Sequence, residues 1–473
     1  MDPGSWRYEL ICIVCLGVGT MCLMNGYDTQ SFLVEPVLHS VHMREPTRME
    51  KHAGYYGQAV LYGTYTSATL IAPWICFRIG SKWSLFVGSL LFTVYQAGFF
   101  VLNSYYYYLS QALMGIGFAL YYSGQGLYMS EHSTRATITR NSSLVSGIGQ
   151  SSMLLGGIVL TVIFYIRQGS STVSDAVLDE ETGGYRNFSN NEIYVIYGVL
   201  LVFTLISNVI FAVMPSQLES DSKLNAIDKP TIRTQLGQLL DTAREPRMIL
   251  LSFFFIFYGL HVSFWLGAYP TTFAFTKVLS GNVFLPAYFS TMVGIGNIVV
   301  GCYITVFVKW YPNFGLVPTM ATQVVLSGAM YFVTVVSTPN FSTIERNDEA
   351  AMWIAPSTLV CCALGILHGM IDCCSCSMRA LICTIAVPRM KLQAYSLAKL
   401  YQSAASCAAY FFSPYLTVYA WMTLLACAQL LSTISFVVVS RQVTNEELQQ
   451  DNCLKTSKIH PADGDCSNDA CRL

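Results

Sequence analysis

Charged residues are scarce in this chain. Only 11% of its 473 residues are Asp, Glu, Lys or Arg, whereas a soluble globular chain contains about 25%. Apolar residues make up 53% of the chain, and the mean hydropathy is +0.47. A soluble domain with so few charges could not cover its apolar surface, so the sequence indicates an integral membrane protein surrounded by the lipid bilayer. The net charge of −1 says nothing about nucleic acid, but no basic run is long enough to bind one.

Motifs for catalysis and cofactor binding are also missing. The sequence has no P-loop, dinucleotide-binding, metalloprotease or nucleophile-elbow pattern, which argues against an enzyme and against a bound cofactor. Cysteine is common, with 16 residues, but none falls in a predicted outer loop, so we expect no extracellular disulfide framework. Cys373, Cys374 and Cys376 cannot all point one way on a helix, and no second Cys/His pair has zinc-like spacing. We therefore interpret them as packing residues and not as a metal site.

Long apolar runs, in contrast, recur along the whole chain. Each is long enough to cross a bilayer as a helix, which takes about 20 residues. The twelve runs lie at 8–26, 58–77, 84–102, 106–128, 143–166, 193–213, 248–268, 284–306, 316–336, 353–386, 393–412 and 415–440, the tenth being overlong. Between the sixth and seventh runs, apolar residues from Ile232 to Ala243 repeat at helical spacing, which predicts a helix along the inner membrane surface.

These runs predict an all-α integral membrane protein with two halves of six helices each, the layout of the major facilitator fold. The N-terminal half is expected at 1–213 and the C-terminal half at 248–440. A cytosolic linker at 214–247 would join them, and the polar tail at 441–473 is predicted to be disordered in the cytosol.

The orientation follows from the basic residues. With the amino terminus in the cytosol, most Lys and Arg residues fall in cytosolic segments, as the positive-inside rule requires. Two glycosylation sequons, at Asn187 and Asn340, then face outward, while a third, at Asn141, faces the cytosol and should stay unmodified. Both termini are therefore predicted to be cytosolic.

Polar residues interrupt the tenth run, which reads HGMIDCCSCSMRALI from His368 to Ile382. His368, Asp372, Cys376 and Arg379, together with a serine, share one face of a helix. A charge near the bilayer centre costs at least about 2.5–3.5 kcal/mol, so such residues face the bundle interior and usually have a partner. The stripe predicts an inward-facing site, although Arg379 could also snorkel to the inner headgroups.

The eleventh run carries a second stripe, with Lys399 and Gln402 on one face. Arg379 and Lys399 should lie at similar depth, where they would repel each other. Each needs an anion, which could be Asp372, Glu131 or a bound solute. We expect a binding site or gate between the tenth and eleventh helices, the alternative for Lys399 again being snorkelling.

Two further features are less specific. Asp28 gathers with two amide side chains at the outer end of the first run, where it either lines a cavity mouth or marks the end of the helix. Gly115-Ile116-Gly117 and Gly156-Gly157 are interpreted as sites of close helix packing. His261 in the seventh run is interpreted as a satisfied buried histidine and not as a titrating group.

Four stretches together resemble a known family. They are GYYGQAVLYGTYTSATLIAP from Gly54, SGQGLYMSEHSTRATITRNS from Ser123, GMID from Gly369 and AYSLAKLYQSAASCAAYFFSPYL from Ala394. The chain is similar over residues 8–440 to the Unc-ninety-three ion-channel regulatory family, a branch of the major facilitator superfamily. The resemblance marks as family-pattern positions Gly124, Gln125, Gly126, Tyr128, Arg140, Asn141, Asp372, Lys399, Gln402 and Pro414.

The chain also departs from the family pattern. Family members follow the aspartate with a short Asn-Thr-Gln group, whereas the aligned residues here are Cys376–Met378. The wider superfamily has an acidic residue where Phe77 stands, and its proton-coupled members have an arginine where Gln111 stands. Both losses weaken the case for a proton-coupled transporter.

Two functions remain open. One is an accessory protein that binds, traffics or regulates a membrane partner such as a potassium channel. The other is a secondary transporter of a small solute, which would bind between the halves near Asp372 and Lys399. The resemblance and the lost coupling residues favour the accessory protein, placed in the plasma membrane rather than in endolysosomes. The inward-facing polar stripe favours the transporter.

Overall fold

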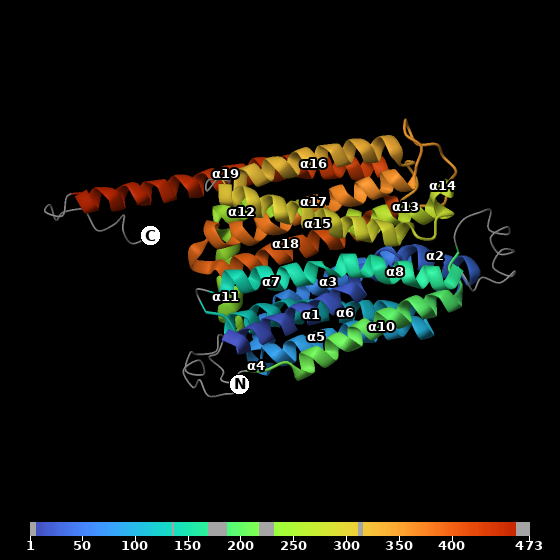
Figure 1. Cartoon of the computed structure of the whole chain (residues 1–473), viewed down its shortest axis with the longest axis horizontal. Coiled ribbons are helices and arrows are strands. Elements are labelled where there is room, and N and C mark those ends of the chain that lie inside the picture. The colour runs from blue at the N-terminus through green and yellow to red at the C-terminus, as the bar shows by residue number, and fades with distance from the viewer. Residues whose placement is uncertain (1–5, 135–136, 169–186, 217–230, 311–315, 460–473) are drawn as a thin grey trace.

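The computed structural model describes residues 6–134, 137–168, 187–216, 231–310 and 316–459, and these are almost entirely helical (Figure 1). The first half contains α1 (Trp6–Ser31), α2 (Val34–Arg44), α3 (Ala53–Thr69), α4 (Ala72–Ile79), α5 (Ser81–Ala97), α6 (Ser104–Glu131), α7 (Ile138–Gln150), α8 (Ser152–Gln168) and α10 (Asn190–Val213). The connecting helix is α11 (Ile232–Arg244). The second half contains α12 (Pro246–Ser263), α13 (Tyr269–Phe275), α14 (Lys277–Ser280), α15 (Leu285–Trp310), α16 (Leu316–Ser337), α17 (Thr358–Ala386), α18 (Lys391–Phe412) and α19 (Val418–Ile459).

Polar caps and prolines set where several helices begin and break. The Asn103 side chain accepts a hydrogen bond from the backbone N–H of Tyr106 and so caps α6. Ser189 and Glu192 form a capping box at the start of α10. Pro73 stands in the first turn of α4, where its missing N–H removes no helical hydrogen bond, and it separates α4 from α3.

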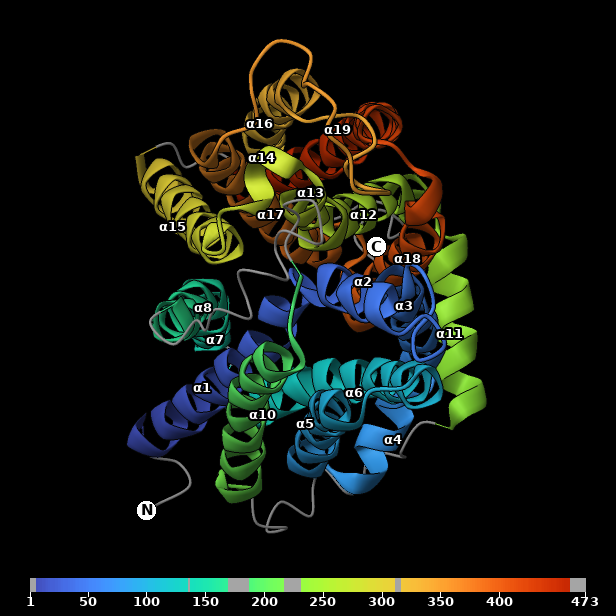
Figure 2. The same ribbon diagram turned by 90° about the vertical axis from the view of Figure 1, so that its right-hand side faces the viewer.

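The two halves lie side by side, the first below and the second above in Figures 1 and 2. We call the end at which α1 begins and α12 begins the inner end, after the predicted orientation, and the opposite end, with α2, α13 and α14, the outer end. Helix α11 packs against α18 and α12 of the second half and lies at the inner end, where the sequence predicts a surface helix.

Nine helical segments among the described residues are long and apolar enough to cross a membrane. Three ranges that the sequence also predicts as spans, those of α3, α6 and α18, are not among these nine. Helix α3 has only 17 residues, and all three helices carry many polar side chains. The chain is therefore a multi-pass membrane protein, and the count of twelve spans stays a prediction.

Two predicted boundaries differ from the structure. The tenth span begins at Thr358 and not at 353, because Ser357 caps α17 by accepting a hydrogen bond from the backbone N–H of Val360. Helix α19 continues to Ile459, although disorder was expected from residue 441. The segment after 441 has no Pro or Gly before Ile459, and an ion pair between Arg247 and Glu446 ties it to α12. The last residues of the predicted tail, 460–473, lie outside the described residues.

The halves are in close contact toward the outer end. A Cβ added to Gly157 on α8 would lie 2.1 Å from Thr291 Oγ1 and 2.7 Å from the Ala287 carbonyl oxygen on α15. Ser290 Oγ donates a hydrogen bond to the carbonyl of Met153 across the same contact, at 2.8 Å. Glycine is therefore required at this crossing, as the Gly156-Gly157 pair indicates.

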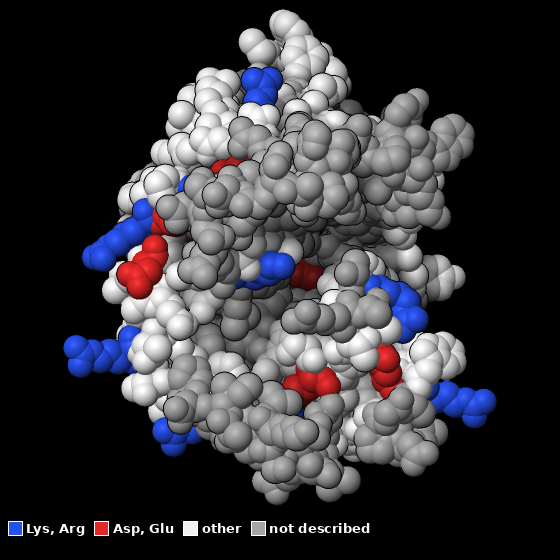
Figure 3. Space-filling model, turned by 90° about the vertical axis from the view of Figure 1, so that its left-hand side faces the viewer, with Lys and Arg blue, Asp and Glu red and all other residues white. Residues whose placement is uncertain are grey.

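At the inner end the same two halves are separated. Figure 3 looks onto this end and shows a hollow between the halves, with basic and acidic side chains visible in it. The described part of the molecule is therefore closed outside and hollowed inside.

Candidate functional site

Two buried cations face the boundary between the halves. Arg379 on α17 is 4% exposed and Lys399 on α18 is 8% exposed. Helix rise places Arg379 about 10 Å before the inner end of α17 and Lys399 about 12 Å beyond the inner start of α18. The structure thus puts the two side chains at similar depth, as their sequence positions suggest.

Aromatic rings and amides surround these cations. The Arg379 guanidinium donates through Nη1 to Gln402 Oε1 at 2.5 Å, and its Cζ lies 4.9 Å from the centroid of the Tyr258 ring. Lys399 Nζ lies 4.0 Å from the centroid of the Tyr122 ring, which belongs to α6 in the other half. Among the described residues, no carboxylate oxygen lies within 4.0 Å of either cation.

Two carboxylates complete the site. Asp372, on α17, is 6% exposed and accepts a hydrogen bond from the Tyr258 hydroxyl at 3.2 Å. Asp28 is half-buried on α1 and accepts one from Ser152 Oγ at 3.1 Å. The two carboxylates lie close enough across the boundary between the halves for their charges to interact. Asp28 therefore lies near Asp372, on the other side of the boundary between the halves.

The predicted stripe on α17 divides between two environments. His368 is fully buried, with its Nδ1 3.4 Å from His261 Nε2 and the rings of Phe264 and Tyr269 around it. Ser375 accepts a hydrogen bond from Gln323 Nε2 of α16 at 2.8 Å. Both residues therefore pack inside the second half, while Asp372 and Arg379 face Tyr258.

Glu131, considered as an anion for the cations, instead accepts a hydrogen bond from Ser81 Oγ at 2.5 Å, between α6 and α5. On α18, Ser403 lies beside the first half, because Thr66 Oγ1 donates to it at 2.8 Å.

The two cations, the two carboxylates and the rings of Tyr122 and Tyr258 together form the central site, which draws on α1, α6, α12, α17 and α18.

The family-pattern residues of α6 and α7 lie away from this centre, at the inner end of the first half. Gly124 lets α5 approach α6, since an added Cβ would lie 3.1 Å from the Ser81 carbonyl oxygen. The Gln125 amide donates to the Tyr121 hydroxyl at 2.9 Å. Gly126 has open space where a Cβ would be.

The other pattern residues of α6 and α7 connect segments of the first half at the same end. Tyr128 donates its hydroxyl hydrogen to the Pro215 carbonyl at 2.7 Å. Asn141 Nδ2 donates to Glu9 Oε1 at 2.6 Å, and Arg140 Nη2 lies 3.8 Å from the same oxygen. Sequence reasoning did not single out Glu9, whose acidic side chain near the inner start of the first apolar run was the available signal.

The predicted glycosylation sites lie at the outer end. Arg346 Nη2 donates to Asn187 Oδ1 at 2.7 Å, and the backbone N–H of Tyr419 donates to Asn340 Oδ1 at 3.1 Å. Each contact uses the amide oxygen, so a glycan attached to the nitrogen leaves it intact.

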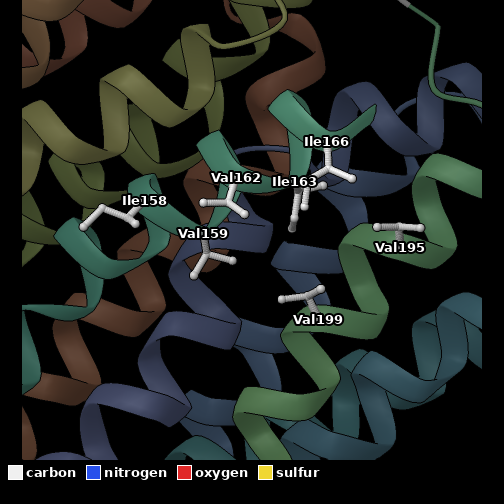
Figure 4. A pocket seen from close by; sticks show the side chains of 7 residues that line it. All are labelled: Ile158, Val159, Val162, Ile163, Ile166, Val195 and Val199. Atoms are coloured by element: carbon white, nitrogen blue, oxygen red, sulfur yellow. The ribbon is translucent and has the colours of Figure 1, made fainter. Parts of the chain in front are cut away.

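One groove of about 500 Å³ lies elsewhere, between α8 and α10 (Figure 4). Its lining is wholly aliphatic: Ile158, Val159, Val162, Ile163, Ile166, Val195 and Val199. Such a groove suits lipid chains and offers nothing to a polar solute, so the charged centre is the candidate functional site.

Comparison with known proteins agrees with this architecture. Among solved structures, the peptide transporter POT in complex with sulfate aligns with a TM-score of 0.64 and 13% identity, covering 92% of this chain and 95% of that one. The inward-open xylose transporter XylE from E. coli aligns with a TM-score of 0.59 and 14% identity, covering 90% and 95%. These likenesses confirm the transporter fold, and at such identity they show the fold alone.

Sequence relatives give the family. The UNC93-like protein MFSD11 of Xenopus tropicalis is 25% identical over 462 residues, covering 94% of this chain and 98% of that protein. Protein unc-93 homolog A of Mus musculus is 21% identical over 325 residues, covering 58% and 69%. The family model described as "Ion channel regulatory protein UNC-93" matches residues 45–437. The chain therefore belongs to the UNC-93 family of membrane proteins, as its motifs indicate.

Proposed function

We propose that this protein binds a small solute between its two halves and carries it across the membrane by alternating access. The observation that carries the proposal is the pair of buried cations, Arg379 and Lys399, without a carboxylate within 4.0 Å among the described residues. The charge of Asp372 acts on both cations from a distance. A buried cation with no carboxylate in contact is still costly, and an anionic group of a solute would offset that cost.

The arrangement of the two halves supports the same proposal. The outer end is closed by contacts such as that of the Tyr55 hydroxyl with the Thr343 carbonyl, at 2.9 Å. The inner end is hollowed (Figure 3), and we propose this hollow as the route between the charged centre and the inner side of the membrane. Rocking one half against the other would exchange that route for an outer one.

The test is solute accumulation in vesicles. The intact chain is reconstituted in liposomes and exposed to a deproteinised extract of cells that make it, and the vesicle contents are analysed by mass spectrometry. We expect at least one solute to accumulate with the wild type and to be lost with Lys399→Gln. Lys277→Gln is the matched control, because Lys277 pairs with Asp348 in an exposed position at the outer end. Equal accumulation in all vesicles, including protein-free ones, would sink the proposal.

A second function is favoured by the family description, which names ion channel regulation. In this alternative the chain is an accessory protein for a membrane partner such as a potassium channel. Purification from native tissue in mild detergent tests it. A second multi-pass protein at fixed stoichiometry supports the accessory role, and a lone chain counts against it.

The proposal includes a location. We propose that both termini lie in the cytosol, because basic residues gather in the inner segments and the sequons at Asn187 and Asn340 lie in the outer ones. We propose the plasma membrane as the location.

A further inference from the structure

The central site separates its charges into two poles. Arg379 and Lys399 form a basic pole toward the inner end, and Asp28 and Asp372 form an acidic pole. Asp372 and Arg379 stand seven residues apart on α17, which is about 10 Å along the helix. The Tyr258 side chain bridges this distance, because its hydroxyl contacts Asp372 while its ring faces Arg379.

Each pole keeps unused hydrogen-bonding capacity. Arg379 Nε is buried without a partner among the described residues, and so is the Tyr65 hydroxyl, which lies close enough to Arg379 to interact with its charge. On the acidic side, the structure gives Asp28 one donor, Ser152, and Asp372 one donor, Tyr258. A carboxylate can accept several hydrogen bonds, so both have room for a further donor.

Several cations elsewhere in the chain form ion pairs with a carboxylate. Arg247 pairs with Glu446, Arg140 with Glu9 and Lys277 with Asp348, all near the ends of the bundle. Arg379 and Lys399, in contrast, have no such pair among the described residues although they lie where screening is weakest. Stability alone would favour a carboxylate in contact with each of them, so an unpaired position is what a binding site for an anionic group would need.

We infer that the solute is a small zwitterion, with its anionic group held by Arg379, Lys399 and the Tyr65 hydroxyl and its ammonium group held by Asp28 and Asp372. The inference rests on the proposed function. The four ionisable groups sum to zero, so a zwitterion satisfies both poles without adding net charge to a poorly screened site. A singly charged anion or cation would satisfy one pole and leave the other uncompensated. The distance between the poles favours a zwitterion whose charges are several bonds apart.

The test uses probes that differ only in charge. The intact chain in lipid nanodiscs is titrated with 6-aminohexanoate, hexanoate and hexylamine, and binding is read from the thermal unfolding midpoint. We expect 6-aminohexanoate to bind at least about tenfold more tightly than either analogue, since each analogue loses one charge-assisted contact. Glycine, whose charges are too close to reach both poles, should bind more weakly than 6-aminohexanoate.

Two variants separate the poles. Asp28→Asn should abolish the advantage of 6-aminohexanoate over hexanoate while retaining hexanoate binding, and Arg379→Gln should abolish the advantage over hexylamine. Each variant is first checked for an unfolding midpoint near that of the wild type. If one of them unfolds early, the wild-type ranking of the three probes still decides the matter.

Hexanoate or hexylamine binding as tightly as the zwitterion would overturn the inference, and so would no binding by any probe. Accumulation of a solute of another charge class in the liposome assay would then leave the proposed transport function standing. If no solute accumulates, both the proposed transport function and the zwitterion inference are contradicted.

Discussion

Lys399 Nζ lies 4.0 Å from the centroid of the Tyr122 ring, so a cation of the second half rests on an aromatic face of the first. This contact crosses the boundary at which the proposed transport would require the halves to rock. Its strength comes from the ring quadrupole, at about 0.5–2 kcal/mol for a poorly solvated pair. It holds the cation without neutralising it, which keeps its charge available to a solute.

Tyr122→Phe should therefore preserve solute accumulation, because phenylalanine keeps the ring face. Tyr122→Leu should reduce accumulation by about twofold to thirtyfold, the range that corresponds to losing the cation–π contact. Accumulation in liposomes measures both variants. If Tyr122→Phe and Tyr122→Leu lose accumulation equally, the site requires the Tyr122 hydroxyl and not the ring face.

The contact between Gly157 and α15 offers a test of the closed outer end. A methyl group at Gly157 would clash with Thr291 Oγ1 and the Ala287 carbonyl, so Gly157→Ala should destabilise the closed arrangement by about 1–3 kcal/mol. A cysteine introduced at Ser290, which is fully buried in this contact, should then react faster with a membrane-impermeant thiol reagent applied from outside. Gly147→Ala is the control, since nothing lies within 4 Å of its added Cβ. Unchanged labelling would mean that the crossing tolerates a methyl group.

Hydrophobic runs were sufficient to predict the helices and the fold, because lipid forces each long apolar segment to satisfy its backbone internally. The neighbours that the polar side chains contact could not be predicted in the same way. Periodicity places His368 with Asp372 on one face, but it does not say which neighbour that face meets. His368 lies beside His261, whereas Asp372 accepts a hydrogen bond from Tyr258 and lies close enough to Asp28 for their charges to interact. Both outcomes depend on tertiary packing between residues far apart in the chain.

The orientation can be tested through the three sequons. Asn187→Gln and Asn340→Gln should each reduce the mass that a glycan-removing enzyme takes off the protein, because both sites are placed on the outer side. Asn141→Gln should leave the mass removed by the enzyme unchanged, since the Asn141 residue is 2% exposed and its side chain donates to Glu9 at the inner end. Gel mobility before and after enzyme treatment gives the readout. A glycan on Asn141 would reverse the proposed orientation.

Acid should destabilise the outer end through His39 on α2, which lies outside the segments that cross the membrane. Burial, together with the nearby charge of Arg346, lowers the pKa of His39 from 6.5 to about 3. The facing ionisable groups are Arg346, His52, His42 and Lys51.

The sign follows from proton linkage. Between about pH 6.5 and pH 3 the unfolded chain binds a proton at His39 that the folded chain does not, so stability falls as the pH falls. At pH 5 the loss relative to pH 8 is about 2 kcal/mol. His39→Gln, which cannot take up this proton, should flatten the unfolding midpoint between pH 5 and pH 8. If the variant and the wild type lose stability in parallel over this range, His39 is not the group responsible.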